Sequence, residues 1–375
     1  MLRRLVTIGA AAFLIAGAAM AETPAYEWPL PTWMPPPPVP ADNPMSAAKV
    51  DLGRHLFHDA RLSRDGTVAC VSCHVQARAF SDGRTVAVGI HGTTGAKNAP
   101  GLANVGYLPV LTWANPHMRS LEFQALIPIF GENPDEMGSA GQEAAILATL
   151  AADPYYAAAF PRAFPDHPAP DLFTITRALA AFQRSLISVT SPYDAFKRQG
   201  DKTALSEAAR RGEQLFFDHR FECYHCHSGV HFTDTLQTAR MPEAEVGFHN
   251  TGLYRDYPAA VPGLIELTGR PQDAGRFRTP SLRNVAVTAP YMHDGSIPDL
   301  RAVIAHYAAG GRAPDHPQKD GMIQGFVATE AEIADLIAFL ESLTDQNFLT
   351  DPRLSDPWPE SHPARARRMM PPAGG

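Results

Sequence analysis

The chain has 375 residues, of which 45% are hydrophobic and 19% are charged, and its formal net charge is −7. This composition is typical of a globular protein and excludes general disorder. The chain carries no basic excess, so we expect no nucleic-acid partner.

The N-terminus has the pattern of a secretory signal peptide. Arg3 and Arg4 are followed by an apolar run and then by Ala19-Met20-Ala21, a small-residue cleavage site. An uncleaved membrane anchor is the weaker alternative, because the apolar run is short for a membrane span. We therefore expect residues 1–21 to be removed and the exported protein to reside in the periplasm without spanning a membrane.

Two segments follow for which the sequence predicts local structure. Residues 22–44 are rich in proline, including Pro35 to Pro38, and are expected to run extended over the surface. Further along, apolar residues at helical spacing predict a helix from Phe173 to Ile187. The buried stripe of this helix consists of Ile175, Leu179, Phe182 and Leu186.

A second helix is predicted near the C-terminus, where Thr329 and Glu332 match a capping box. Its buried stripe consists of Ile333, Leu336, Ile337 and Leu340. Strand-like runs are few, so the fold is expected to be mainly α. Residues 346–375 are rich in proline and arginine and are expected to form a mobile C-terminal tail.

All four cysteines belong to two Cys-x-x-Cys-His motifs, which consist of Cys70, Cys73 and His74, and of Cys223, Cys226 and His227. This pattern is the attachment site of a c-type haem, in which both thiols bind the porphyrin and the histidine becomes the proximal iron ligand. A pair of redox sites or a shared zinc site would use the same residue types. A redox motif does not need the histidine that follows both pairs, so the sequence predicts two covalent c-type haems.

The chain is also internally repeated. Gly53 to Arg61 and Gly212 to Arg220 both read G-x-x-L-F-x-D-x-R, and a haem motif follows each of them. Further downstream, an L-x-N-V sequence occurs in both halves, ending at Val105 and at Val285. We expect two cytochrome c-like domains related by internal duplication, each with one covalent haem. Their predicted bounds are residues 45–190 and 200–345.

A haem that activates peroxide keeps one axial position open and needs a group that moves a proton between the two peroxide oxygens. With this requirement in view, several stretches resemble the bacterial di-haem cytochrome c peroxidase/MauG superfamily: Asp51 to His74, Asn98 to Pro100, Gln124, Asn133 to Gly138, and Thr279 to Gly295. Three stretches look closer to its MbnH-like branch, which is associated with oxidising tryptophan on a partner protein: Val39 to Ser46, Leu111 to Pro116, and Ile129 to Met137.

The resemblance implies roles around the first haem. His74 would be the proximal ligand of the peroxide-reacting haem, Glu136 the distal acid–base residue, and Gln124 a second polar residue of the distal pocket. Without the resemblance, Glu136 would be interpreted as a solvated loop carboxylate. Trp113 matches a tryptophan that lies between the two haems, although an ordinary core tryptophan would look the same.

The resemblance also implies the ligands of the second, electron-transfer haem. His227 would hold this haem on one side and Tyr307 on the other, as in MauG-like enzymes, whereas conventional di-haem peroxidases have methionine there. An anionic tyrosinate favours oxidised iron and lowers the reduction potential. Two alternatives are that Tyr307 is a core aromatic residue and that Met292 is the ligand.

Two further sites are weaker predictions. The family's bridging calcium would be bound by the side chain of Asn98 and by the backbone carbonyls of Thr288 and Pro290, since oxygen ligands suit calcium. His91 lies close to the place where conventional peroxidases carry a distal histidine that blocks the resting haem, with a spacing that differs by about one residue from the family pattern. If His91 binds the iron, the resting enzyme would need reductive activation; the alternative is that His91 is an ordinary loop histidine.

Three functions compete. The first is a peroxide-dependent enzyme that forms a high-valent di-haem state and removes electrons from a tryptophan of a periplasmic partner by long-range transfer. The second is a conventional peroxidase that reduces hydrogen peroxide with electrons from a small redox protein. The third is a di-haem electron carrier without enzymatic activity. Tyr307 and the MbnH-like stretches favour the first.

Overall fold

The computed structural model describes residues 26–365 and 367–369, so the predicted signal peptide lies outside the described residues. Within these residues the fold is mainly α-helical, as expected. The one sheet found in the described ranges consists of β1 (Phe248–His249) and β2 (Phe277–Arg278), which pair antiparallel. None of the helices in the described part of the chain is long and apolar enough to cross a membrane.

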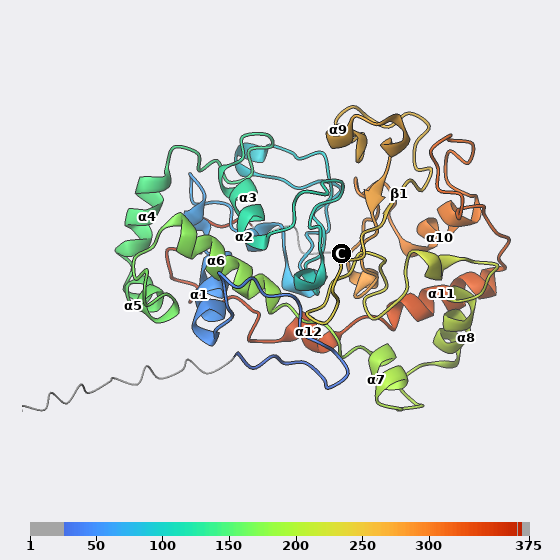
Figure 1. Ribbon diagram of the computed structural model, residues 1–375, viewed down its shortest axis with the longest axis horizontal. Coiled ribbons are helices and arrows are strands. Elements are labelled where there is room, and N and C mark those ends of the chain that lie inside the picture. Colours follow the sequence, from blue (N-terminus) through green and yellow to red (C-terminus); the bar gives the residue numbers. More distant parts are fainter. Residues whose placement is uncertain (1–25, 366, 370–375) are drawn as a thin grey trace, which may run out of the picture.

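The helices fall into two groups that lie on the left and right of the molecule (Figure 1). The first group consists of α1 (Ala47–Phe57), α2 (Leu121–Gln124), α3 (Leu126–Phe130), α4 (Glu143–Ala151), α5 (Pro154–Ala163) and α6 (Leu172–Arg184). The second consists of α7 (Pro192–Arg198), α8 (Glu207–Phe216), α9 (Ile265–Thr268), α10 (Leu300–Ala308) and α11 (Glu330–Glu341). The short helix α12 (Gln346–Thr350) lies near the boundary between the groups.

Both predicted helices are present. Helix α6 covers Leu172–Arg184 and buries Ile175, Leu179 and Phe182; it ends three residues before the predicted Ile187, and Leu186 is buried just beyond its end. Helix α11 begins after Thr329, whose side chain accepts a hydrogen bond from the backbone N–H of Glu332, while the Glu332 carboxylate accepts one from the Thr329 N–H at 2.8 Å. This reciprocal pair confirms the predicted capping box.

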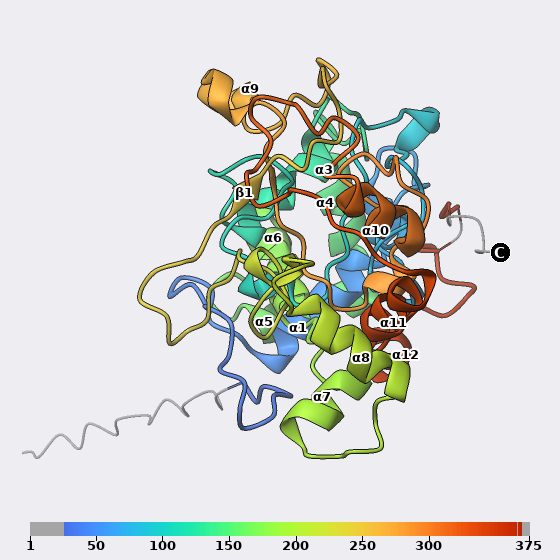
Figure 2. The ribbon, with the colours of Figure 1, turned by 90° about the vertical axis from the view of Figure 1, so that its right-hand side faces the viewer.

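The repeated glycines lie at two equivalent helix contacts. Helix α1 packs on α6 in the first group, and α8 packs on α11 in the second (Figure 2). A β-carbon on Gly53 would lie 1.9 Å from the carbonyl oxygen of Ala178, and one on Gly212 would lie 1.9 Å from that of Asp335. Only glycine lets the two backbones of each pair approach this closely.

The repeated L-x-N-V sequences also have equivalent roles. Asn104 and Asn284 both adopt the left-handed conformation, with φ of 60° and 62°. The side-chain oxygen of Asn104 accepts a hydrogen bond from the Ser188 N–H at 2.8 Å, and that of Asn284 accepts one from the Asp345 N–H at 2.8 Å. Each asparagine therefore ties its loop to the segment that follows the closing helix of its group.

The prediction of a mobile tail at residues 346–375 is wrong for the described part of this segment. Leu354, Trp358 and Ala364 are buried in the core of the first helix group. The indole N–H of Trp358 donates a hydrogen bond to the His55 carbonyl of α1 at 3.0 Å. These few apolar residues anchor the segment. The composition of the segment did not predict this, because prolines and arginines outnumber them.

The proline-rich segment behaves as expected in its described part, from residue 26 onward. It contains turns but no helix or strand, and it crosses the surface of the first group. The contacts that hold it include the burial of Met34 and two hydrogen bonds, from the Tyr107 hydroxyl to the Pro35 carbonyl at 2.9 Å and from the Ala239 N–H to the Pro36 carbonyl at 2.9 Å.

Candidate haem sites

Both Cys-x-x-Cys-His motifs adopt the same local structure. The first begins with the 3₁₀ turn η2 (Cys70–Ser72) and the second with η6 (Cys223–His225). In each turn the N–H of the histidine donates to the carbonyl of the first cysteine at 3.0 Å, for His74 and for His227. The turn therefore brings both thiols and the imidazole to one short stretch of chain, as covalent haem attachment requires.

A second pair of hydrogen bonds orients the two imidazoles. Nδ1 of His74 donates to the Phe80 carbonyl at 2.7 Å, and Nδ1 of His227 donates to the Phe232 carbonyl at 3.0 Å. Because Nδ1 carries the proton, Nε2 is left as the neutral donor atom that an iron ligand needs. Burial also lowers the pKa of both histidines, which disfavours the charged form that cannot bind a metal.

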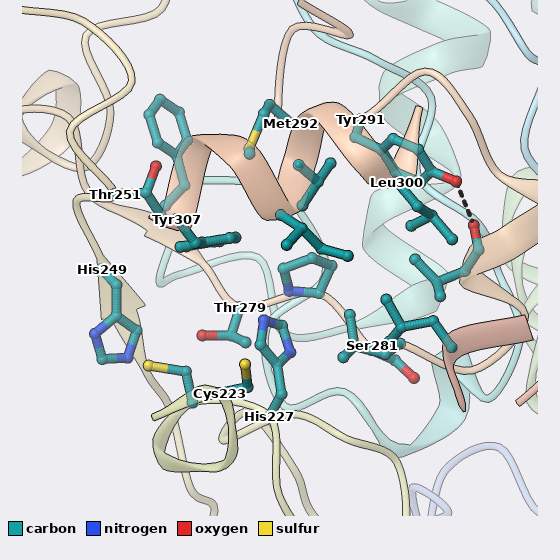
Figure 3. A pocket seen from close by; sticks show the side chains of 18 of the residues that line it. Cys223, His227, His249, Thr251, Thr279, Ser281, Tyr291, Met292, Leu300 and Tyr307 are labelled. Carbon is teal, nitrogen blue, oxygen red and sulfur yellow. Dashed lines mark hydrogen bonds between the residues drawn. The ribbon is translucent and has the colours of Figure 1, made fainter. Parts of the chain in front are cut away.

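A cavity of about 460 Å³ lies above the second motif (Figure 3). Cys223 and His227 line it from one side, and Met292 and Tyr307 line it from the opposite side. The remaining lining is largely apolar and includes Leu300, Val303, Ile304, Leu336 and Leu340. Two thiols and one imidazole at one wall of an apolar cavity are the surroundings that a covalent haem requires.

The cavity also contains a buried cation. Arg278 is 3% exposed, and its guanidinium donates to the carbonyls of Thr112 and Thr279 at 3.2 and 3.1 Å. In the described part of the chain it forms no ion pair with a carboxylate. Burial lowers its pKa to about 10. The Asp234 carboxylate acts on this guanidinium only from beyond ion-pair distance, so the guanidinium can still bind an anionic group of a ligand, such as a haem propionate.

Tyr307 lies on α10 and faces the second motif across the cavity (Figure 3). Burial raises the pKa of its phenol far above the ordinary value, and the nearby Cys226 and Cys223 raise it further. Met292, the alternative ligand, lines the same wall in a left-handed conformation with φ of 73°. The structure thus brings both candidate ligands to the side opposite His227.

Glu136 lies beside the first motif. Its carbonyl accepts a hydrogen bond from the Ile90 N–H at 2.9 Å, and a β-carbon on Gly89 would lie 2.6 Å from its Cα. Burial raises the pKa of the Cys70 and Cys73 thiols to about 12, and the negative charge of Glu136 contributes to both shifts. Its own pKa is raised by burial. Glu136 is therefore a partly desolvated carboxyl group near both thiols, and not a solvated loop residue.

Gln124 is the last residue of α2 and is half-buried. The loop that carries Glu136 is tied to the next helix, α3, by two backbone hydrogen bonds, from Met137 to the Pro128 carbonyl at 3.1 Å and from Ser139 to the Ile129 carbonyl at 3.0 Å. The end of α2 and this loop therefore lie on adjoining parts of the first group.

Trp113 connects the two halves of the molecule. Its indole N–H donates to the Asn98 carbonyl at 2.9 Å, and its own carbonyl accepts from the Arg278 N–H of β2 at 2.7 Å. The side chain is buried and lines the cavity of the second motif. A residue of the first half thus lies against the second haem site.

Asn98, Thr288 and Pro290 all line this same cavity, so the structure brings the three predicted calcium ligands to one region. The side-chain amide of Asn98 donates to the Arg84 carbonyl at 2.6 Å, which leaves its side-chain oxygen for another partner. His91 is exposed, with φ of 57°, and fits the loop interpretation of this residue.

Three residues of the second site were missed by the sequence analysis. Arg278 directly precedes the stretch Thr279 to Gly295, so a search one residue upstream of that stretch would have included it. Asp234 and His249 lie close to Cys226 but are separated from it by 8 and 23 positions, and their spacing carries no signal.

The two haem motifs, their oriented histidines and the cavity define an oxidoreductase of the c-type cytochrome class. Residues 47–203 match the family described as di-haem cytochrome c peroxidase. The chain is 37% identical over 310 residues to the methylamine utilization protein MauG of Methylophilus methylotrophus, covering 82% of this chain and 85% of that protein. It is 35% identical over 353 residues to the cytochrome-c peroxidase IdrP1 of Denitromonas iodatirespirans, covering 86% and 87%.

A solved structure is also similar: a MauG-like protein associated with microbial copper homeostasis superposes with a TM-score of 0.86 at 47% identity, covering 89% of this chain and 100% of that chain. The chain belongs to the di-haem cytochrome c peroxidase/MauG family. Membership supports a peroxide-using di-haem oxidoreductase with two c-type haems.

Proposed function

We propose that this protein is a periplasmic enzyme that uses hydrogen peroxide to oxidise a tryptophan residue of a partner protein by long-range electron transfer. The similarity to MauG and to a MauG-like protein tied to copper homeostasis supports this substrate class. The N-terminal pattern of Arg3, Arg4 and Ala19-Met20-Ala21 supports export to the periplasm. When bound, the two haems supply the redox chemistry.

The position of Tyr307 carries the proposal. Tyr307 and His227 line opposite sides of the cavity, and both side chains would hold the iron of the second haem (Figure 3). Burial raises the pKa of this phenol and so favours its protonated form; as an iron ligand, Tyr307 would give up that proton and bind as a tyrosinate. A tyrosinate favours oxidised iron, and this suits an enzyme that must store oxidising equivalents more than one that passes electrons at high potential.

Glu136 is the residue that moves the proton. Burial raises its pKa, so the carboxylate accepts a proton more readily than a solvated glutamate and can return it to the leaving oxygen of peroxide. Gln124 lies on the adjoining helix end and would orient the peroxide in the same pocket. A plain electron carrier has no need of a partly desolvated carboxyl group here.

The second motif is the more accessible of the two, which supports electron exchange with a partner at this haem. The two residues between the cysteines of the first motif, Val71 and Ser72, are buried. In the second motif Tyr224 is partly exposed and His225 is exposed. Trp113, between the halves, would carry electrons from this haem to the first.

A conventional peroxidase that takes electrons from a small redox protein is the second candidate, because the relative IdrP1 is described as a cytochrome-c peroxidase. The two functions differ at the resting first haem. A MauG-like enzyme reacts with peroxide in the fully oxidised state, whereas a peroxidase blocked by a distal histidine reacts only after one haem is reduced.

The deciding experiment is the visible and near-infrared spectrum of the fully oxidised di-haem protein before and after one equivalent of hydrogen peroxide. We expect prompt loss of the ferric Soret band and a new near-infrared feature. Glu136→Gln should slow this reaction by about 10²- to 10⁴-fold. The exposed neighbour Glu132→Gln is the matched control and should react at the wild-type rate. A wild-type protein that reacts only after partial reduction would favour the conventional peroxidase.

Tyr307→Met tests the ligand directly. It should raise the midpoint potential of the second haem and abolish the near-infrared feature, while haem attachment at Cys223 and Cys226 stays complete by mass spectrometry. If Met292→Ala changes the spectrum of this haem and Tyr307→Met does not, Met292 is the ligand and the proposal fails.

We also propose a calcium ion bound by the Asn98 side chain and the carbonyls of Thr288 and Pro290. Their position around one cavity supports it. Chelation with EGTA should slow the peroxide reaction, and calcium should restore it better than magnesium. Elemental analysis that finds no calcium in active holoprotein would contradict this site.

A further inference from the structure

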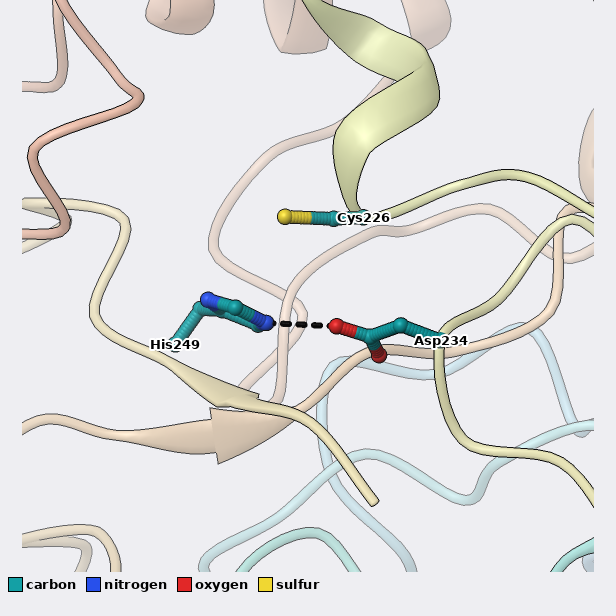
Figure 4. A group of neighbouring side chains, drawn as sticks. All are labelled: Cys226, Asp234 and His249. Carbon is teal, nitrogen blue, oxygen red and sulfur yellow. Dashed lines mark hydrogen bonds and ion pairs between the residues drawn. The ribbon is translucent and has the colours of Figure 1, made fainter. Parts of the chain in front are cut away.

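A doubly hydrogen-bonded histidine lies at the edge of the second haem site. Nε2 of His249, in β1, is 2.6 Å from Oδ2 of Asp234, and Nδ1 is 2.6 Å from Oδ2 of Asp320. Figure 4 shows the first of these contacts beside Cys226. Carboxylates only accept hydrogen bonds, so both ring nitrogens donate and His249 is an imidazolium. The group Asp234, His249 and Asp320 is called the charge triad below.

The charge triad lies against the point where the second haem is attached. The sulfur of Cys226, a carboxylate oxygen of Asp234 and a ring nitrogen of His249 all lie within 4.8 Å of one another. His249 also lines the cavity together with His227. The three triad side chains are only 23–24% exposed, so solvent screens their charges less than those of surface residues.

The triad is charged throughout the neutral range. The hydrogen bonds to Asp234 and then Asp320 raise the pKa of His249 well above its ordinary value, and the free thiol of Cys226 adds to this shift. The hydrogen bond from His249 lowers the pKa of Asp320 to about 2, and it lowers that of Asp234 against the opposing effect of burial. One imidazolium and two carboxylates give the triad itself a net charge of −1. Two guanidinium groups lie close enough to act on it, that of Arg278 on Asp234 and that of Arg276 on Asp320, and they are unchanged in the variants tested below.

We propose that the charge triad is a fixed negative group that stabilises the oxidised form of the second haem, with His249 as the positioning residue that holds both carboxylates in place. The physical basis is that a nearby negative charge lowers the free energy of the more positive, oxidised iron. The inference requires the haem at Cys223 and Cys226 but not the tryptophan substrate of the proposed function.

A purely mechanical role is the main alternative. The loop that carries Asp320 also contains Met322 and Ile323, which line the cavity, so the triad could serve only to hold this loop closed. The two roles respond differently to substitutions that keep the hydrogen bonds but change the charge. Asparagine at position 320 can still accept a hydrogen bond from His249, but it carries no negative charge.

The test is a spectroelectrochemical titration of the second haem in the holoprotein at mildly alkaline pH, without peroxide. Asp320→Asn leaves one carboxylate and the imidazolium, so the potential should rise. His249→Gln leaves two uncompensated carboxylates, so the potential should fall. Each shift should correspond to at least a tenfold change in the equilibrium constant of reduction, which is about 59 mV for one electron.

Asp315→Asn is the matched control. Asp315 is on the same loop and pairs with Arg255, but it is 63% exposed and does not line the cavity. Its loss removes the same formal charge and should leave the potential unchanged. Asp234→Asn provides a second charge-removing variant in case the protein with Asp320→Asn does not fold.

Opposite signs for the carboxylate and histidine variants support the proposal, because a loosened loop would move both potentials in one direction. Shifts of equal sign, or shifts no larger than that of Asp315→Asn, overturn it. The titration does not depend on peroxide, so failure of the proposed function in the peroxide experiment and failure of the charge triad are separate results.

Discussion

Replacing Gly53 with alanine is expected to force α1 and α6 apart. The added β-carbon would lie 1.9 Å from the Ala178 carbonyl oxygen and 2.9 Å from the β-carbon of Phe182. The closest ordinary carbon–oxygen contacts in proteins are about 3.3 Å, so the helices must separate by about 1.4 Å. The obstacle is backbone and cannot rotate away, unlike the end of a side chain.

The cost can be placed on the scale of overpacked cores, which lose about 1–3 kcal/mol. We expect Gly53→Ala to reach the upper end, about 3 kcal/mol, less up to about 1 kcal/mol because alanine is the better helix former. The net loss of about 2 kcal/mol corresponds to a fall in Tm of roughly 4–8 °C for a domain of this size. Gly212→Ala should behave alike, since its β-carbon would meet the Asp335 carbonyl at the same 1.9 Å.

The assay is thermal unfolding of the holoprotein followed by far-UV circular dichroism. Gly321→Ala is the control, because a β-carbon at Gly321 meets no atom within 4 Å and φ there is not positive. It should change the free energy of unfolding by less than about 0.5 kcal/mol. If Gly53→Ala and Gly212→Ala are as stable as Gly321→Ala, the close helix contact in the two halves is not as described.

Three further predictions follow from the same contacts. Burial raises the pKa of Glu136, so the rate of the peroxide reaction should fall as the pH drops through this raised pKa and the carboxylate takes up a proton. Stopped-flow measurements should show this decrease at acid pH in the wild-type protein and not in Glu136→Gln. Asp194 and Arg283 form an ion pair with side chains 2% and 1% exposed, so Asp194→Asn should cost about 3–5 kcal/mol in denaturant unfolding, and a loss below 1 kcal/mol would contradict this. Trp358→Ala should cost about 3–5 kcal/mol in the same assay, whereas a mobile C-terminal segment would make it neutral.

The features predicted correctly from sequence depend on residues that are close along the chain. The capping box of Thr329 and Glu332 spans one helical turn, and the apolar stripe from Ile175 to Leu186 spans about three. The repeated G-x-x-L-F-x-D-x-R sequence predicted two related halves, and its glycines, Gly53 and Gly212, lie at equivalent helix contacts in the structure.

The failures concern contacts between distant segments. The C-terminal segment was interpreted as mobile because prolines and arginines dominate its composition. Its anchor, Trp358, bonds to His55, which lies 303 positions earlier. One buried indole can hold a segment of otherwise polar residues in place, since burying a large aromatic side chain stabilises the folded state by several kcal/mol.

The sequence by itself predicts where the haems attach, because five consecutive residues supply both thiols and the proximal imidazole of each motif. It also determined the helices whose caps and apolar faces are local. Only the tertiary structure decided what surrounds the second haem site. This site is built by residues from separate segments of the chain: Tyr307, Arg278 and the charge triad. Their spacing along the chain does not indicate that they are close in space, because the fold sets that distance.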